Sequence, residues 1–313
     1  MKIRKIALLV LIVLVGFVSC NKDDDTVDPP VIEIRDRAEQ QIADNDSIVE
    51  YLKTHYYNSS ELSANDNPSI QDIVITKFST GAVPDGSTLL MDAIEKKTVN
   101  FADTDYDFYV LKLNQGGGID SPSFADDIRT HYEGLLLDDT VFDSSLEAPY
   151  DSDLITEVVV EGWRRVFPDF NTAESFVENS DGTVSYLNKG LGIMFLPSGL
   201  AYFSNATSGF AAYSPLIFKF ELLQMLENDH DGDGVPTYLE DLNGNGELIT
   251  LDQLADDDTD EDGTPDYADT DDDGDGVLTI NEDLNNDGDP TNDDTDGDGT
   301  PNYLDTDDTA SKS

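Results

Sequence analysis

The chain has 313 residues, which is long enough for one or two folded domains with tails. Its 67 acidic and 17 basic residues give a formal net charge of −50. Nucleic acid is therefore not expected as a partner, because phosphate binding needs clusters of Lys and Arg, and cations are expected instead. Cys20 is the only cysteine in this sequence, so an intramolecular disulfide is excluded.

The chain begins with a short basic stretch and an unbroken apolar run over residues 6–18. The run is short for a bilayer span and has the length of the apolar part of a signal peptide. It ends in FVSC, which resembles the lipobox of lipoproteins, so residues 1–20 predict a lipoprotein signal peptide with Cys20 as the lipidated residue. A plain signal peptide with an incidental cysteine is the alternative.

Residues 21–32 are polar and acidic, and they predict an extended tether. A lysine followed by acids just after Cys20 resembles the surface-export signal of some Gram-negative lipoproteins. A merely solvated linker explains the same composition, so both interpretations stay open.

Residues 33–106 are interpreted as an accessory segment, which begins with a helical pattern over residues 31–57. Ile34, Ala38 and Ile42 are spaced to share one apolar helix face. The same spacing continues through Ile48, Tyr51, Leu52 and Tyr56. Ser47 and Glu50 fit a capping box, which allows a second helix to start there.

The rest of the accessory segment favours strands. Alternating apolar residues predict a strand over residues 70–78, and residues 98–101 and 106–113 are further candidates. His55 has no second His or Cys beside it, so we interpret it as a packed or half-exposed helix residue rather than a ligand. No catalytic cluster is visible in this part of the chain.

Residues 107–227 carry two groups of motifs. HYEGLLLDDTVFDSS is followed by EVVVEGW over residues 131–163, and GLGIMFLPSGLAYF is followed by PLIFKFELL over residues 190–223. These motifs resemble the signature of the FKBP family, the macrolide-binding peptidyl-prolyl isomerases. Strand-like patterning around a short helix at Trp163 predicts an α+β fold, in which an antiparallel sheet wraps on that helix, and the resemblance implies the same.

The resemblance implies a prolyl isomerase pocket without a metal, nucleophile or catalytic cofactor. Trp163 matches the floor beneath the proline ring, and Tyr202 matches the hydroxyl that donates to a substrate carbonyl. The other matched positions are mostly aromatic or aliphatic walls. The full set is Tyr132, Phe142, Asp143, Tyr150, Val159, Val160, Trp163, Tyr202 and Phe218.

Three features depart from the family pattern. Phe203 follows Tyr202 where the family usually has Gly, and Ala211 and Ala212 stand where tandem prolines are usual. An insertion lies between residues 170 and 189, with its turn expected at residues 179–182. A pocket plugged by Phe203 or by the insertion would favour a binding protein over an enzyme.

Residues 228–308 form a repetitive acidic tail. Six copies of a pattern with oxygen ligands at positions 1, 3 and 5 and glycine at position 6 start at Asp229, Asp241, Asp258, Asp271, Asp283 and Asp294. Position 12 is acidic each time, which is the calcium-loop pattern. The copies adjoin one another, so the flanking helices of an EF-hand have no room. The array resembles thrombospondin type 3 repeats and predicts a calcium-bound stalk, with a disordered acidic brush as the alternative.

The candidate calcium ligands of the six copies, hereafter repeats 1 to 6, are Asp229, Asp231, Asp233 and Glu240; Asp241, Asn243, Asn245 and Asp252; Asp258, Asp260, Asp262 and Asp269; Asp271, Asp273, Asp275 and Glu282; Asp283, Asn285, Asp287 and Asp294; and Asp294, Asp296, Asp298 and Asp305. Asp294 ends repeat 5 and begins repeat 6. His230 occupies a position that is not a ligand position, so we interpret it as a bystander.

The sequence as a whole predicts an outer-membrane lipoprotein, facing the periplasm or the cell surface, with an isomerase domain and a calcium-binding tail. Its expected partners are proline-containing exported polypeptides, the membrane through the lipid anchor, and macrolide inhibitors. The alternatives are a non-catalytic protein that binds proline-containing segments and a purely structural surface protein.

Overall fold

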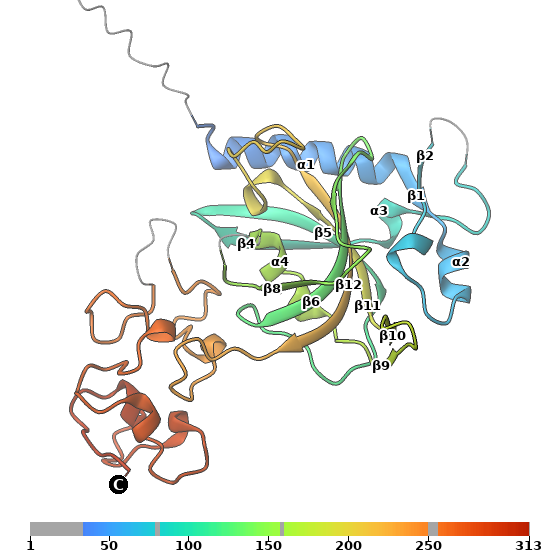
Figure 1. The fold of residues 1–313 in the computed structure, drawn as a ribbon. Helices are drawn as coiled ribbons and strands as arrows, with labels where there is room; N and C mark the ends of the chain where they lie inside the picture. Colours follow the sequence, from blue (N-terminus) through green and yellow to red (C-terminus); the bar gives the residue numbers. More distant parts are fainter. Residues whose placement is uncertain (1–33, 79–81, 157–159, 250–255, 313) are drawn as a thin grey trace, which may run out of the picture. The chain divides into compact units, whose positions relative to one another are not determined.

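The computed structural model describes residues 34–78, 82–156, 160–249 and 256–312 (Figure 1). The predicted signal peptide, Cys20, the tether, Val159 and Asp252 lie outside the described residues. The chain divides into two units, residues 1–34 and 35–313, and the following description concerns the second. None of the helices in the described ranges combines the length and apolar character that a bilayer span requires.

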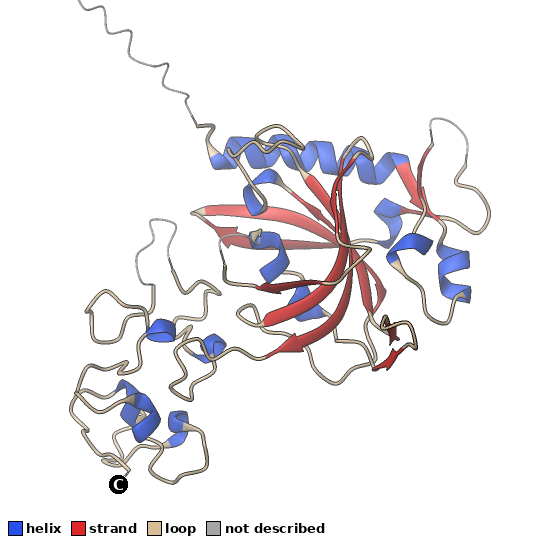
Figure 2. Ribbon diagram, viewed as in Figure 1, coloured by secondary structure: helices blue, strands red, loops and turns tan. Residues whose placement is uncertain are grey.

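The second unit is built on a seven-stranded sheet in which every pair is antiparallel (Figure 2). The strand order is β4-β5-β11-β12-β6-β7, and β8 pairs with β6. The strands are β4 Glu95–Phe101, β5 Thr104–Asn114, β6 Asp127–Leu136, β7 Val141–Ser144, β8 Tyr150–Asp153, β11 Gly190–Leu196 and β12 Leu216–Leu226. The predicted α+β class is confirmed.

One face of the sheet packs on the short helix α4, Glu161–Arg164, and on the 3-10 turn η2, Phe167–Asp169. Side chains alternate along β12, so Phe218 and Phe220 enter this core while Ile217 enters the core on the opposite face. The expected wrapping of the sheet around a short helix is therefore present, and Trp163 belongs to this core.

The opposite face is covered by helix α1, Arg37–Thr54, which lies along the sheet in Figure 1. A three-stranded sheet and short helices follow it. These elements are β1 His55–Tyr57, α2 Ser59–Ala64, η1 Ile70–Asp72, β2 Ile75–Lys77, β3 Thr88–Leu89 and α3 Leu90–Ala93. The N-terminal segment is thus a cover for one sheet face.

Two local predictions for this segment are wrong. α1 is one continuous helix, because the Ser47 hydroxyl donates to the Ala43 carbonyl one turn earlier and caps no new helix. The strand expected at residues 70–78 is reduced to β2, because Ser69 and Asp72 form a capping box that starts η1.

The expected apolar face of α1 is wrong in its first half, whereas Ile48, Tyr51 and Leu52 of its second half are buried as predicted. Ile34 and Ile42 are 63% and 65% exposed, whereas Asp44 is buried. The Asp44 carboxylate accepts hydrogen bonds from the Ser198 backbone N–H and hydroxyl, so the loop after β11 provides polar partners for this helix face. Partners distant in the sequence therefore override the apolar pattern in the first half of the helix.

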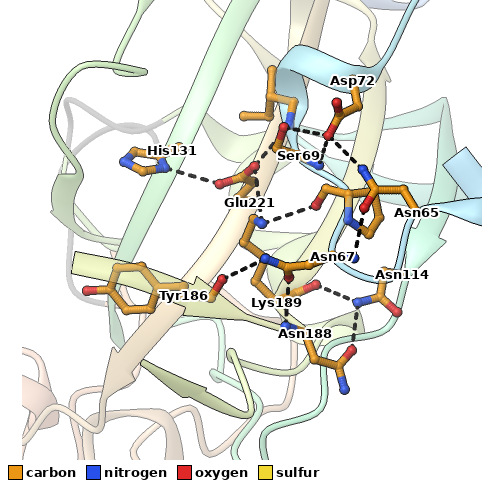
Figure 3. Close-up of polar contacts among 12 residues, drawn as sticks. Asn65, Asn67, Ser69, Asp72, Asn114, His131, Tyr186, Asn188, Lys189 and Glu221 are labelled. Atoms are coloured by element: carbon orange, nitrogen blue, oxygen red, sulfur yellow. Dashed lines mark hydrogen bonds and ion pairs between the residues drawn. The ribbon is translucent and has the colours of Figure 1, made fainter. Parts of the chain in front are cut away.

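A buried polar network fastens the segment before η1 to the sheet (Figure 3). Glu221 of β12 is 4% exposed and accepts from the Ile70 N–H at 2.9 Å. Its two oxygens also face the Lys189 Nζ at 3.7 Å and the His131 Nδ1 at 3.1 Å, and Lys189 donates to the Pro68 carbonyl. The sheet itself begins at β4, so residues 95–106 of the proposed accessory segment belong to it.

The inserted segment forms a hairpin of β9 Ser175–Glu178 and β10 Val184–Leu187. Gly182 has φ of +86°, and its N–H donates to the Asn179 carbonyl, so the turn predicted at residues 179–182 is confirmed.

The tail is rich in loops and contains only short 3-10 turns among its described residues. They are η4 Thr237–Leu239, η5 Asp266–Ala268, η6 Thr279–Asn281, η7 Pro290–Asn292 and η8 Asn302–Leu304. The glycine at position 6 of each repeat has a positive φ, for example +102° at Gly234 and +104° at Gly299, which other residues rarely adopt.

Candidate functional site

A small cavity lies over α4 on the inner face of the sheet. Its volume is about 100 Å³, and eight of the nine residues predicted from sequence line it. The lining residues are Tyr132, Phe142, Asp143, Tyr150, Val160, Trp163, Tyr202 and Phe218. The ninth, Val159, lies outside the described residues.

Trp163 forms the floor of this cavity and is 4% exposed. Its indole makes edge-to-face contacts with three neighbouring aromatic rings. The ring centroids of Tyr132, Phe167 and Phe218 lie 5.2, 5.2 and 5.6 Å from it at steep angles. Such edge-to-face contacts are the favoured geometry of aromatic pairs, so the floor is fixed before any ligand arrives.

The polar groups of the cavity are phenols and one carboxylate. The Tyr132 hydroxyl donates to Asp143 Oδ2 at 2.6 Å, and the Ser144 N–H donates to Asp143 Oδ1. Burial, followed by the nearby Asp143 and Tyr150, raises the pKa of Tyr202 above its ordinary value. The Tyr202 phenol is therefore protonated at neutral pH and can donate a hydrogen bond to a carbonyl oxygen.

Sequence reasoning missed two residues that shape the cavity wall. A Cβ atom at Gly134 would lie 2.5 Å from the Phe142 ring, so the absence of a side chain in β6 makes room for that ring. Phe210 packs against Phe142 and Tyr202, with centroids 4.9 and 5.2 Å away. The glycine in HYEG was a visible signal, whereas Phe210 lies in a loop without a motif.

Phe203 and the inserted segment, either of which could have blocked the cavity, do not line it. Phe203 has φ of +45°, and its ring packs on Tyr213 and under the Arg37 guanidinium. The inserted hairpin contributes Phe176 and Tyr186 to a separate groove. The cavity is therefore not plugged by Phe203 or by the insertion.

The tail brings acidic side chains together in four groups, within which the contributing oxygens all lie within 4.8 Å of one another. The groups are Asp231, Asp233, Glu240 and Asp272; Asp258, Asp260 and Asp262; Asp271, Asp273 and Asp275; and Asp294, Asp296 and Asp298. The group at repeat 1 contains Asp272 of repeat 4, which sequence reasoning missed, and does not contain the predicted Asp229. Asp229 instead accepts from the Gly232 and Gly234 N–H groups.

The predicted position-12 residues differ in how they join these groups. Glu240 belongs to the first group, and Glu282 lies close enough to Asp271, Asp273 and Asp275 for their charges to raise its pKa. Asp269 and Asp305 belong to none of the four groups. Repeats 2 and 5, which have asparagine at some ligand positions, form no group of three acids among the described residues.

Several of these carboxylates fit a cation, because their oxygens are buried without a hydrogen-bond partner among the described residues. Both oxygens of Glu240 and of Glu282, and one oxygen of Asp273, are in this state. Burial, followed by neighbouring acids, raises the pKa of Glu240 to about 9 and that of Glu282 to about 8. Buried carboxylates of this kind need a proton or a metal ion.

The first two repeats also contact elements that carry the cavity. His230 Nε2 lies 3.2 Å from Asp153 Oδ2 at the end of β8. His230 belongs to none of the four acidic groups, so it remains a bystander to metal binding while it contacts the sheet. Arg165, the C-cap of α4, donates to the Asn245 carbonyl of repeat 2 at 3.2 Å.

Part of the chain is similar in sequence to prolyl isomerases of the FKBP type. It is 28% identical over 142 residues to the FKBP-type 22 kDa peptidyl-prolyl cis-trans isomerase of Escherichia coli, covering 45% of this chain and 60% of the relative. It is 26% identical over 148 residues to the FKBP-type isomerase FkpA of Aeromonas hydrophila, covering 47% of this chain and 48% of the relative. The chain thus spans only about half to three-fifths of these relatives.

Parts of the chain also match a solved structure and a family model. The crystal structure of FkpA from Escherichia coli matches with a TM-score of 0.31 and 23% identity, over 38% of this chain and 47% of that one. The family model described as BamM C-terminal matches residues 230–288, which fall within the acidic tail. The lipobox and the thrombospondin-type resemblance stay predictions.

Proposed function

We propose that this protein is a peptidyl-prolyl cis-trans isomerase of the FKBP type. The observation that carries the proposal is the aromatic cavity over α4, whose lining contains eight of the nine residues that the resemblance implies. Similarity to proteins named as FKBP-type isomerases supports it independently of the cavity.

The geometry suits rotation about an Xaa-Pro bond. The barrier to this rotation, ~18–20 kcal/mol, arises from amide resonance, which places charge on the carbonyl oxygen and is stabilised by water. A proline ring seated on the Trp163 indole would leave water behind, so the planar ground state would lose part of its stabilisation. Tyr202 would donate a hydrogen bond to a substrate carbonyl and hold it during rotation.

The cavity volume of about 100 Å³ suits one small ring rather than a large ligand. Pockets for drug-sized molecules are usually ~300–1,000 Å³. A macrolide would therefore place only its proline-like ring in the cavity and would rest the remainder on the rim. Proline-containing exported polypeptides are the proposed substrates.

The experiment is a prolyl isomerisation assay on an Xaa-Pro peptide, with and without a macrolide. Macrolide-sensitive acceleration supports both the reaction and the cavity. A folded sample that binds the peptide without acceleration would support the alternative of a non-catalytic binding protein. The absence of Phe203 and the hairpin from the cavity lining favours the enzyme.

The acidic tail is proposed to bind Ca²⁺ as a structural ion. Oxygen ligands in glycine-containing loops match the preferences of this hard cation, and extracellular sites of this kind bind at ~10⁻⁴–10⁻³ M. The chain's own residues would hold the ion through carboxylates such as Asp233, Glu240 and Glu282. One oxygen of Asp233 and both oxygens of the two glutamates are buried without a hydrogen-bond partner among the described residues. The ion takes no part in the isomerisation.

The proposal also includes a lipid anchor and an outer-membrane location. The sequence at Cys20 supports lipidation and an outer-membrane location, facing the periplasm or the surface. Labelling of the expressed protein with a radioactive fatty acid tests this point, and Cys20→Ala should abolish the label. Label retained in Cys20→Ala would contradict it.

A further inference from the structure

The most enclosed acidic group of the tail draws its members from two repeats that are distant in the sequence. Asp231, Asp233 and Glu240 belong to repeat 1, and Asp272 belongs to repeat 4. Their contributing oxygens lie within 4.8 Å of one another, and Asp233, Glu240 and Asp272 are each 1% exposed.

No hydrogen bond accounts for this arrangement among the described residues. Both oxygens of Asp272, both oxygens of Glu240 and one oxygen each of Asp231 and Asp233 are buried without a partner. Mutual repulsion and lost hydration disfavour four ionised carboxylates at such short range. The remaining oxygen of Asp233 caps the Val235 N–H, so the side chain is already oriented with its free oxygen toward the group.

The position of Asp272 within its own repeat is informative. It is the second residue of repeat 4, whereas the other repeats have His230, Leu242, Thr259, Leu284 and Thr295 at this position. The backbone N–H at position 2 closes the loop in several repeats, as from Asp272 to Thr279 Oγ1 and from His230 to Thr237 Oγ1. The calcium-loop pattern therefore needs no acid there, and the Asp272 side chain is directed to repeat 1.

The tail has a small apolar core, so a cation bound by these four carboxylates would matter for its folding. Among the described residues after Asn228, the buried apolar side chains are Val235, Leu248, Pro290 and Tyr303. So small an apolar core provides little driving force, because stabilisation scales with buried apolar area. Tyr303 of repeat 6 is also buried, and burial, followed by the charges of Asp272 and Glu240, raises its pKa. Asp266 of repeat 3 is buried as well, and its charge is one of those that raise the pKa of Glu240.

We propose that Asp231, Asp233, Glu240 and Asp272 form one divalent-cation site, and that this site joins repeat 1 to repeat 4 and organises the fold of the tail. Its ligand is a hard cation with oxygen preference, Ca²⁺ under the proposed function of the tail, on which this inference rests. The other three acidic groups each lie within a single repeat, so they can bind an ion without joining distant parts of the tail.

The test compares Asp272→Asn with Asp298→Asn in the full chain. Both changes remove one carboxylate charge with little change in shape, but Asp298 belongs to an exposed group within repeat 6. Calorimetric titration with CaCl₂ measures the number and affinity of sites, and small-angle X-ray scattering measures compaction of the tail against Ca²⁺ concentration.

We expect Asp272→Asn to remove the tightest site and to shift the midpoint of compaction at least tenfold to higher Ca²⁺. Asp298→Asn should lose a weaker site and leave the midpoint within twofold. Glu240→Gln should reproduce the effect of Asp272→Asn. Near-ultraviolet dichroism from Trp163 should stay unchanged in all three variants, which verifies that the isomerase-like core is folded.

Two outcomes would overturn the inference. One is an unchanged affinity and midpoint in Asp272→Asn, and the other is an equal shift in both aspartate variants. If the unmodified chain bound no Ca²⁺, the proposed function of the tail would fail instead, so the two failures are distinguishable. Tb³⁺ luminescence sensitised by Tyr303 provides a second measurement, and Asp272→Asn should reduce it severalfold.

Discussion

Truncation of the cavity floor, Trp163→Ala, tests the assignment of the site most sharply. The indole is 4% exposed and lines the cavity between Tyr132, Tyr150 and Phe218. Removal of the indole takes away the contact on one face of a bound proline ring, while the backbone of α4 can stay in place. The variant should therefore lose substrate recognition and should also lose stability.

Both effects can be estimated. Removing a large buried aromatic side chain costs about 3–5 kcal/mol of folding free energy. Complete burial of a proline ring is worth roughly 2 kcal/mol, and loss of the contact on one face removes about half of that. The value of kcat/KM for an Xaa-Pro peptide should then fall about fivefold or more.

A matched control separates recognition from stability. Phe167 is completely buried and packs against Trp163, with centroids 5.2 Å apart, yet it does not line the cavity. Phe167→Leu should lower the denaturation midpoint but keep kcat/KM within about twofold of the unmodified protein. Calcium binding should be unchanged in both variants, because the cavity and the tail groups share no residues.

Stopped-flow measurement of peptide isomerisation, on samples shown by dichroism to be folded, decides the matter. A folded Trp163→Ala protein with unchanged kcat/KM would refute the assignment of the cavity. Equal loss of activity in Phe167→Leu would show that the assay reports folding rather than the floor of the site.

Three further predictions follow from the packing and the titrating groups. Gly134→Ala places a Cβ atom 2.5 Å from the Phe142 ring. We therefore expect the free energy of unfolding, measured by urea titration, to fall by about 1–3 kcal/mol and kcat/KM to fall severalfold. An unchanged kcat/KM would show that this wall of the cavity does not contact the substrate. Phe203→Ala should lose stability but keep kcat/KM within about twofold, because the Phe203 ring packs on Tyr213 and Arg37 outside the cavity lining. A large change in activity would show that Phe203 belongs to the site. Burial lowers the pKa of His55 below its ordinary 6.5, so the unfolded chain takes up the proton more readily and stability should fall as the pH drops from about 7 toward 5. His55→Gln should flatten this dependence of the denaturation midpoint, and an identical slope would exclude His55 as its source.

The sequence allowed the cavity to be predicted because its residues lie in contiguous motifs. Tyr132, Phe142 and Trp163 occur in strings whose order and spacing carry the resemblance, and antiparallel pairing then brings them together. Gly134 and Phe210 were missed because their importance depends on which ring lies opposite them in space.

The helix covering the opposite face was harder to predict. Periodicity assigned Ile42 to its buried side, but the structure buries Asp44 there, since Ser198 provides hydrogen bonds from 154 residues away. A single sequence contains no signal for such a partner. Asp272 was missed for a related reason, because the loop pattern describes ligands within one repeat and this residue faces another.

Prolyl isomerisation by the cavity over α4 is the central claim about this protein. The direct measurement is the rate of cis-to-trans conversion of an Xaa-Pro peptide by the purified protein, with and without a macrolide. We predict acceleration that the macrolide suppresses and that Trp163→Ala reduces at least fivefold, in line with the lost contact to the proline ring. A folded protein that leaves the uncatalysed rate unchanged would contradict the central claim.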